Sequence, residues 1–295
     1  MNLENHSAAI ARQAVFGYGD AVQPCGPWNW RFAIQNGMRL PVTAKFEEEF
    51  LHLTHSTEVH CLSTELLERI LLGNCRLSGG AKIVLAETGG TFAVSADIAV
   101  LEENQLRERL CLAMCGLQDG MLLLKSGDLA PAAECQESFA NEPELERLLQ
   151  ASSWPSTESG PNEFSVELNA DSGVAALIRR TKNSVVVSVE FVRPASLSEV
   201  CRRAMAVFLL TASGSLRFVR AYAAESQGQW SFGMQVGLST VPAPEEIDHA
   251  LAALTVAHRV CARESNVHLY EAAASCYLAA RNLSTTSQPQ IEKEN

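Results

Sequence analysis

The sequence predicts an α+β fold made of two tandem repeats, each an α-β-β-β-α-β-β-α unit whose antiparallel sheet is covered by helices. Some segments have apolar residues at helical spacing, and others alternate apolar and polar residues as half-buried strands do. Two Gly-containing turns, Glu87–Phe92 and Glu225–Trp230, each lie between strand-like segments and match at an offset of 138 residues. An acidic pair opens the helix after each turn, at Glu102-Glu103 and Glu245-Glu246. The shared order of elements therefore indicates a divergent repeat.

The first repeat shows a local signal for most of its elements. Residues 28–35 alternate apolar and polar side chains and end at an Asn-Gly turn, which is typical of a strand that enters a hairpin. Ser63 stands directly before an apolar-periodic segment, as an N-cap does, and Glu47–Glu49 mark a bend. The expected elements are a helix over 3–15, a Gly/Pro-rich connection over 17–27, a strand over 28–35, one or two strands over 40–53, a helix over 64–72, strands over 82–86 and 92–100, and a helix over 102–124 with Gly116 and Gly120 inside it.

The second repeat follows a mixed Gly, Pro and acidic linker over 126–141. Its helix over 197–210 is apolar around most of its circumference, so it has to bury more than one face. We expect this helix to pack between its sheet and the other half of the chain, with an external partner as the alternative. The expected elements are a helix over 142–151, a Ser/Pro/Gly loop over 152–161, strands over 164–168, 174–180 and 185–192, a helix over 197–210, strands over 216–224 and 230–238, and helices over 245–263 and 267–283.

Composition limits the classes of partner. The chain has 295 residues, 47% of them hydrophobic and 19% charged, and a net charge of −11, as expected of a globular protein. It has no cluster of Lys and Arg, so we expect no nucleic-acid partner. Residues 1–160 carry 11 basic and 21 acidic residues, whereas residues 161–295 carry 12 and 13. The first half therefore holds most of the negative charge.

The cysteines and the apolar segments predict the compartment. Nine cysteines, most of them within apolar stretches, are typical of buried, reduced thiols in a cytoplasmic protein. No apolar run approaches the ~20 residues of a membrane span, and the first residues show no signal peptide, so we expect no membrane partner. The expected domains are residues 1–130 and 131–283, followed by a disordered tail over 284–295.

The order of elements, the acidity and the size of each unit resemble the class I type III secretion chaperones and the related YbjN-type bacterial proteins. Members of that family are small acidic cytoplasmic proteins, usually homodimers, that bind an unfolded or extended segment of another protein along exposed apolar patches. The resemblance implies a non-enzymatic adaptor with a protein partner, such as a secreted or unfolded client. It also implies a pseudo-dimer within one chain, which can in turn form a homo-oligomer. It assigns a role to no individual residue.

A metal-dependent enzyme or metalloprotein is the alternative function. His52, His55, His60 and Cys61 lie close together in sequence, and imidazole and thiolate groups are the usual zinc ligands. Their spacing fits no familiar zinc motif, and within a strand His52 and His55 would point to opposite faces. A solvated strand end is the simpler interpretation. Because the sequence also lacks a phosphate loop, a nucleophile elbow and a dinucleotide loop, we expect no cofactor and name no catalytic residue.

Two cysteine motifs need separate consideration. Cys25-Gly26-Pro27-Trp28 is similar to the start of a thioredoxin active site, but Trp28 stands where the resolving cysteine would be. Cys111 and Cys115 lie one helical turn apart, where helix geometry would strain a disulfide. We expect both motifs to serve in packing.

Overall fold

The structure is a computed structural model that describes residues 3–18, 20–36, 38–59, 62–87, 90–100, 103–126, 145–160, 162–169, 173–181, 184–194, 196–226, 229–239 and 241–283. The expected tail over 284–295, most of the expected linker and the expected domain boundary at 130/131 lie outside these ranges. His60 and Cys61 lie outside them too.

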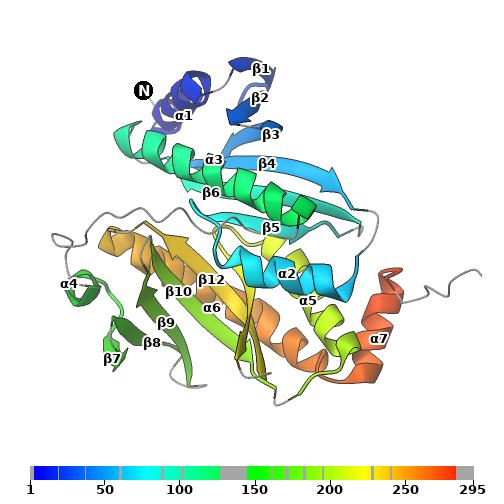
Figure 1. Ribbon diagram of the computed structural model, residues 1–295. Coiled ribbons are helices and arrows are strands. Elements are labelled where there is room, and N and C mark those ends of the chain that lie inside the picture. Colours follow the sequence, from blue (N-terminus) through cyan, green and yellow to red (C-terminus); the bar gives the residue numbers. More distant parts are fainter. Residues whose placement is uncertain are drawn as a thin grey trace, which may run out of the picture.

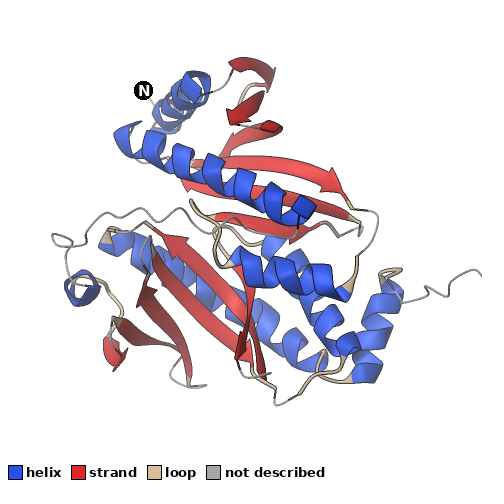
Figure 2. Ribbon diagram, viewed as in Figure 1, coloured by secondary structure: helices blue, strands red, loops and turns tan. Residues whose placement is uncertain are grey.

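Each half holds one six-stranded antiparallel sheet with helices packed on it (Figures 1 and 2). The strand order is β1-β2-β3-β4-β6-β5 in the first sheet and β7-β8-β9-β10-β12-β11 in the second, so matched strands occupy matched places. The first half comprises α1 (Leu3–Tyr18), β1 (Asp20–Gly26), β2 (Asn29–Asn36), β3 (Met38–Glu47), β4 (Phe50–Glu58), α2 (Thr64–Asn74), β5 (Ala81–Leu85), β6 (Thr91–Ala99) and α3 (Glu103–Ser126). The second half comprises α4 (Leu145–Gln150), β7 (Ser156–Gly160), β8 (Glu163–Asn169), β9 (Val174–Arg180), β10 (Val185–Val192), α5 (Glu199–Gly214), β11 (Arg220–Ser226), β12 (Gln229–Leu238), α6 (Pro244–Val267) and α7 (Glu271–Ala280).

The predicted fold class is confirmed, but each half contains one strand more than expected. Strands β1 and β7 form where the sequence predicts a Gly/Pro-rich connection and a Ser/Pro/Gly loop. Both are outer strands that pair with a single neighbour through a shifted register. An edge strand of this kind buries few side chains, so it needs no apolar alternation for its formation and leaves no such pattern in the sequence. The repeat unit is therefore α-β-β-β-β-α-β-β-α.

Local signals fix the ends of several elements. The hydroxyl of Ser63 accepts a hydrogen bond from the Leu66 N–H at 3.1 Å and so caps α2, as predicted. In the second half Ser198 caps α5, which begins at Glu199 rather than at the expected residue 197. The predicted bend between β3 and β4 is a tight turn, in which Glu48 and Glu49 both have positive φ, at 49° and 66°.

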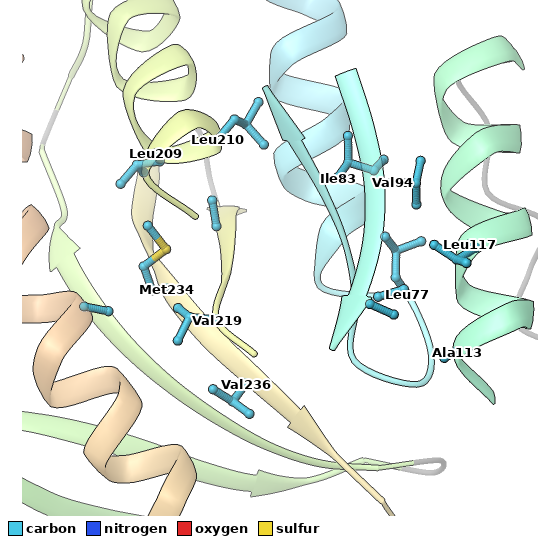
Figure 3. Packing of buried hydrophobic residues seen from close by; sticks show 14 of the residues in the cluster. Leu77, Ile83, Val94, Ala113, Leu117, Leu209, Leu210, Val219, Met234 and Val236 are labelled. Atoms are coloured by element: carbon cyan, nitrogen blue, oxygen red, sulfur yellow. The ribbon is translucent and has the colours of Figure 1, made fainter. Parts of the chain in front are cut away.

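The two glycines inside α3 let this helix lie close against the first sheet. A Cβ atom at Gly120 would lie 2.5 Å from a methyl group of Val94, and one at Gly116 would lie 2.2 Å from the Ser78 carbonyl oxygen. Figure 3 shows Ala113 and Leu117 of α3 directed at this side of the sheet. The interruptions seen in the sequence are therefore contact points with the core rather than breaks in the helix.

The two halves make reciprocal contacts through α2 and α5. Thr64 and Glu199 each directly follow the N-cap of their helix, and their side chains are hydrogen-bonded to each other at 3.1 Å. Helix α2 packs on β11 of the second half, and α5 packs on β5 of the first half. Glu68 and Arg202 add an ion pair between the two helices at 2.5 Å. Equivalent elements of the two halves therefore contact each other in a reciprocal way.

Helix α5 is buried on several sides, as its apolar circumference predicts. It contacts α2 and β5 of the first half, its own sheet, and α7. Helix α7 has no counterpart among the described residues of the first half. It is shorter than the helix expected over 267–283 because α6 continues to Val267. The expectation that α5 packs between its sheet and the other half is therefore confirmed.

A single amide connects the two sheet edges that face each other. Asn74, fully buried at the end of α2, accepts from the Ile83 N–H at 2.8 Å and donates to the Ile83 carbonyl at 3.1 Å. It also donates to the carbonyl of Ala221 in β11 at 3.1 Å. The edges of β5 and β11 lie side by side, yet the sheets stay separate. No helix in the described part of the chain is long and apolar enough to cross a membrane.

Candidate functional site

The histidines proposed as metal ligands do not converge. His52 Nδ1 lies 2.6 Å from Asp97 Oδ1, whereas His55 Nδ1 lies 2.7 Å from the carbonyl oxygen of Pro41. Across the ladder His52 faces Asp97 and His55 faces Val94, whose side chain is directed at α3. The two histidines thus lie on opposite faces of the sheet, as predicted. Within the described ranges, which exclude His60 and Cys61, no three His, Cys, Asp or Glu side chains are placed to hold a metal ion.

His52 instead belongs to a buried polar cluster where the two halves meet. The carboxylate of Asp97 accepts from His52 on one oxygen, and on the other it accepts from the Phe218 N–H at 2.9 Å and contacts Lys82 Nζ at 3.2 Å. Burial alone would raise the pKa of Asp97, but the His52 hydrogen bond, the Lys82 charge and the Phe218 N–H hold it far below its usual range. Asp97 is therefore ionised and links both halves.

Lys82 and Arg220 make reciprocal contacts between the halves. Lys82 Nζ donates to the carbonyls of Ser213 at 3.1 Å and Leu216 at 2.5 Å, at the C-terminal end of α5. The guanidinium of Arg220 donates to three carbonyls between the end of α2 and the start of β5, those of Cys75, Leu77 and Ala81. Each half therefore supplies the cation that satisfies the other half's turn. This arrangement links the two halves.

The Arg220 guanidinium is buried without a carboxylate among its hydrogen-bond acceptors in the described structure. When the amide oxygen of Gln235 faces it, that oxygen accepts from Nε at 2.9 Å and from Nη2 at 3.2 Å. All five N–H groups then have acceptors. Burial lowers the pKa of Arg220 to about 10, so the group stays charged at neutral pH. The cluster is a structural connection between the halves.

A groove on the outer surface of the first half is the better candidate site. Its volume is about 420 Å³, and it lies between one face of α1 and the turn that joins β1 to β2. Phe16 and Trp28 are 45% and 41% exposed, although both are large and apolar. The residues that line the groove are Ala9, Arg12, Gln13, Phe16 and Trp28.

The groove is positioned by the amphipathic pattern of α1. Positions 9, 12, 13 and 16 share one helical face, and the opposite face carries small buried residues that press α1 onto the sheet. The Arg12 guanidinium lies over the Phe16 ring at 5.5 Å, and the Trp28 ring packs edge-on against Phe46 at 6.3 Å. Two aromatic rings are thus held in place at the surface beside one cation. Such a site can bury an apolar segment and pair with a carboxylate.

The sequence pattern gives an incomplete account of this site. The sequence predicts Trp28 to be the first apolar residue of an alternating strand. In the structure β2 begins at Asn29, and the side chains of Trp30, Phe32 and Ile34 form its buried face. Trp28 is left in the turn and is exposed. The spacing of Ala9, Arg12, Gln13 and Phe16 on one face of α1 is the signal that could have indicated the groove.

The cysteines are less buried than expected. Cys201 and Cys261 are buried, but Cys25, Cys111, Cys115 and Cys276 are exposed. Each lies on an outer strand or on the solvent side of a helix, so an apolar sequence neighbourhood does not predict burial there. The expected packing role of Cys25 and of the Cys111–Cys115 pair is therefore wrong.

Comparison with known proteins assigns no family. No protein-family description and no curated protein matches the chain. Among solved structures, the di-domain ARO/CYC StfQ from the steffimycin biosynthetic pathway is 9% identical over 93% of this chain and 96% of that chain, with a TM-score of 0.14. A TM-score this low supports no argument about fold or function.

Proposed function

We propose that this protein is a non-enzymatic, chaperone-like adaptor of the cytoplasm that binds an apolar segment of another protein in the groove between α1 and the β1–β2 turn. The observation that carries the proposal is the exposure of Phe16 and Trp28 on two sides of one groove. Exposed aromatic residues that share a concave site are typical of protein-binding surfaces. The resemblance in element order to secretion chaperones supports the same class of function.

Contacts inside the chain already occupy several other apolar surfaces. The apolar faces of α2 and α5 are used between the two halves, and the edges of β5 and β11 face each other. The outer strand β1 contains Pro24, which has no N–H group, and its pairing with β2 shifts register twice. Both features disfavour the addition of a partner strand. Binding would therefore rest on burial of side chains against Phe16 and Trp28, with Arg12 orienting an acidic residue of the partner.

The test is a comparison of captured proteins between two surface variants. Immobilised wild-type protein is incubated with lysate of the native cells, and retained proteins are identified by mass spectrometry. The double variant Phe16→Ser, Trp28→Ser should lose the partner. The matched control is Tyr270→Ser, which removes a 71% exposed aromatic residue far from the groove in sequence, and it should retain the partner.

The salt dependence sharpens the same experiment. Because the contact is mainly apolar, retention should persist at about 0.5 M added salt, where exposed charge pairs are strongly screened. Loss of the partner at that salt concentration, or equal retention by the groove variant and the wild type, would contradict the proposal. Recovery of the protein itself as the partner would identify the groove as a self-association surface, which light scattering can verify.

A further inference from the structure

Cys111 and Cys115 form an exposed pair of thiols on the solvent side of α3. Both are free and both are exposed. They lie one helical turn apart, and a hydrogen bond with Cys111 is among the influences on the Cys115 thiol. Side chains at this spacing have Cβ atoms about 5–6 Å apart, so the sulfur atoms can reach a common point between them.

The rest of α3 keeps that geometry fixed. The opposite face of the helix is fully buried at Leu110, Ala113 and Leu117, which pack on the first sheet. The backbone therefore cannot turn to change the separation of the two thiols without breaking core contacts. A disulfide between them would need a dihedral angle and a Cβ separation that a regular helix does not supply. The pair is thus arranged to act as a dithiol ligand rather than to close a disulfide.

We propose that Cys111 and Cys115 together bind one Cu(I) ion as a two-coordinate dithiolate site. Thiolate is a soft ligand that selects Cu(I), whereas zinc sites in proteins are almost always four-coordinate. In the described part of the chain no set of three metal-ligating side chains exists that could complete a zinc site here. Each thiol loses one proton, two S–Cu bonds form, and two protons pass to solvent.

The proposed site should bind the ion in a pH-dependent way. The thiolate is the metal ligand, so the ion has to displace the protons of both thiols. Apparent affinity should fall as pH falls, because protons and Cu(I) compete for the same two sulfur atoms.

The experiment is an anaerobic titration of the reduced full-length protein with Cu(I) in competition with bicinchoninate, whose Cu(I) complex is coloured. Cys111→Ser and Cys115→Ser should each weaken the binding of one equivalent by more than the roughly 10–100-fold that loss of an outer-shell partner costs. Cys276→Ser is the matched control, since it removes another exposed helical cysteine. It should leave that equivalent unchanged.

The result that would overturn the proposal is equal Cu(I) binding by the wild type and both single variants, or an equal loss in Cys276→Ser. X-ray absorption of the one-equivalent complex should show two sulfur neighbours, and a count of three or four would also contradict it. Circular dichroism of each variant checks that the fold is retained, which is expected because both thiols are at the surface. The site uses none of the groove residues, so its failure would leave the proposed adaptor function untouched.

Discussion

Each half places one buried cation at the junction, and different chemical groups compensate the charge of the two cations. Lys82 in β5 and Arg220 in β11 lie 138 residues apart in sequence, and each donates to carbonyls at the C-terminal end of a helix of the other half, α5 and α2 respectively. Lys82 also contacts the ionised carboxylate of Asp97. Within the described structure Arg220 is matched by three carbonyls and the amide of Gln235 instead.

The two cations have different partners because their shapes differ. The guanidinium spreads one charge over five N–H groups in a plane, so it can be satisfied by several dipoles at once. An ammonium group is compact and strongly hydrated, and its removal from water is compensated mainly by an opposite charge. The first half therefore depends on a charge pair and the second half on the number and direction of hydrogen bonds.

Removal of the carboxylate should produce the largest effect. Asp97→Ala leaves the Lys82 ammonium buried without its counter-charge, and loss of one member of a buried pair typically costs about 3–5 kcal/mol. The matched change Gln235→Ala removes a neutral acceptor from Arg220 and should cost about 1–3 kcal/mol. Urea unfolding of both variants gives the two free energies. Equal costs would show that charge makes no difference between the halves.

The second prediction tests whether the planar guanidinium of Arg220, with its five N–H groups, is needed at the junction. Arg220→Lys keeps the charge but reduces five donors to three. At least one of the four buried acceptors, which are the three carbonyls and the amide oxygen of Gln235, therefore loses its partner. We expect a loss of about 1–3 kcal/mol in the free energy of unfolding. The control is Arg217→Lys, at a partly exposed ion pair with Glu48, which should change it by less than about 0.5 kcal/mol. A tolerated Arg220→Lys would show that a point charge is sufficient there.

The smallest effect concerns the contact between the end of α6 and α7, which has no equivalent among the described residues of the first half. His268 is 1% exposed and lies between the rings of Phe208 and Tyr277. Burial lowers its pKa, and the nearby Glu264 carboxylate only partly opposes this. The stabilisation is therefore present above the unfolded pKa of about 6.5 and is lost as pH falls through the folded value.

The measurement is the free energy of unfolding at about pH 7.5 and about pH 5.5, on either side of the ordinary histidine pKa. The wild type should lose on the order of 1 kcal/mol more than His268→Phe over this interval. His6→Phe, at an exposed histidine, should behave like the wild type. The same loss in all three proteins would place the pH dependence elsewhere.

Parts of this architecture are visible in the sequence and parts are not. The caps, hairpins and apolar helices are predicted because each leaves a local pattern, as Ser63 does before α2. Strands β1 and β7 are not predicted because their residues bury little. The exposure of Trp28 depends on where β2 begins, which differs by one residue from the predicted start.

The junction cations show a signal that the sequence holds but local patterns do not reveal. Lys82 and Arg220 are separated by the same 138 residues as the two hairpin turns. Asp97 and Gln235 share that spacing as well. A comparison of the two halves position by position would thus have marked these residues, although only the structure shows which carbonyls they reach.

Asn74 has a consequence for how the chain avoids uncontrolled assembly. The N–H and carbonyl of Ile83, which point out of an edge strand, are the groups with which a further strand would form a ladder. Because the Asn74 amide occupies both, β5 cannot be extended by β11 or by the equivalent edge of another molecule. One side chain thus blocks strand addition at the place where two sheet edges come together, and it thereby disfavours domain swapping and fibre growth.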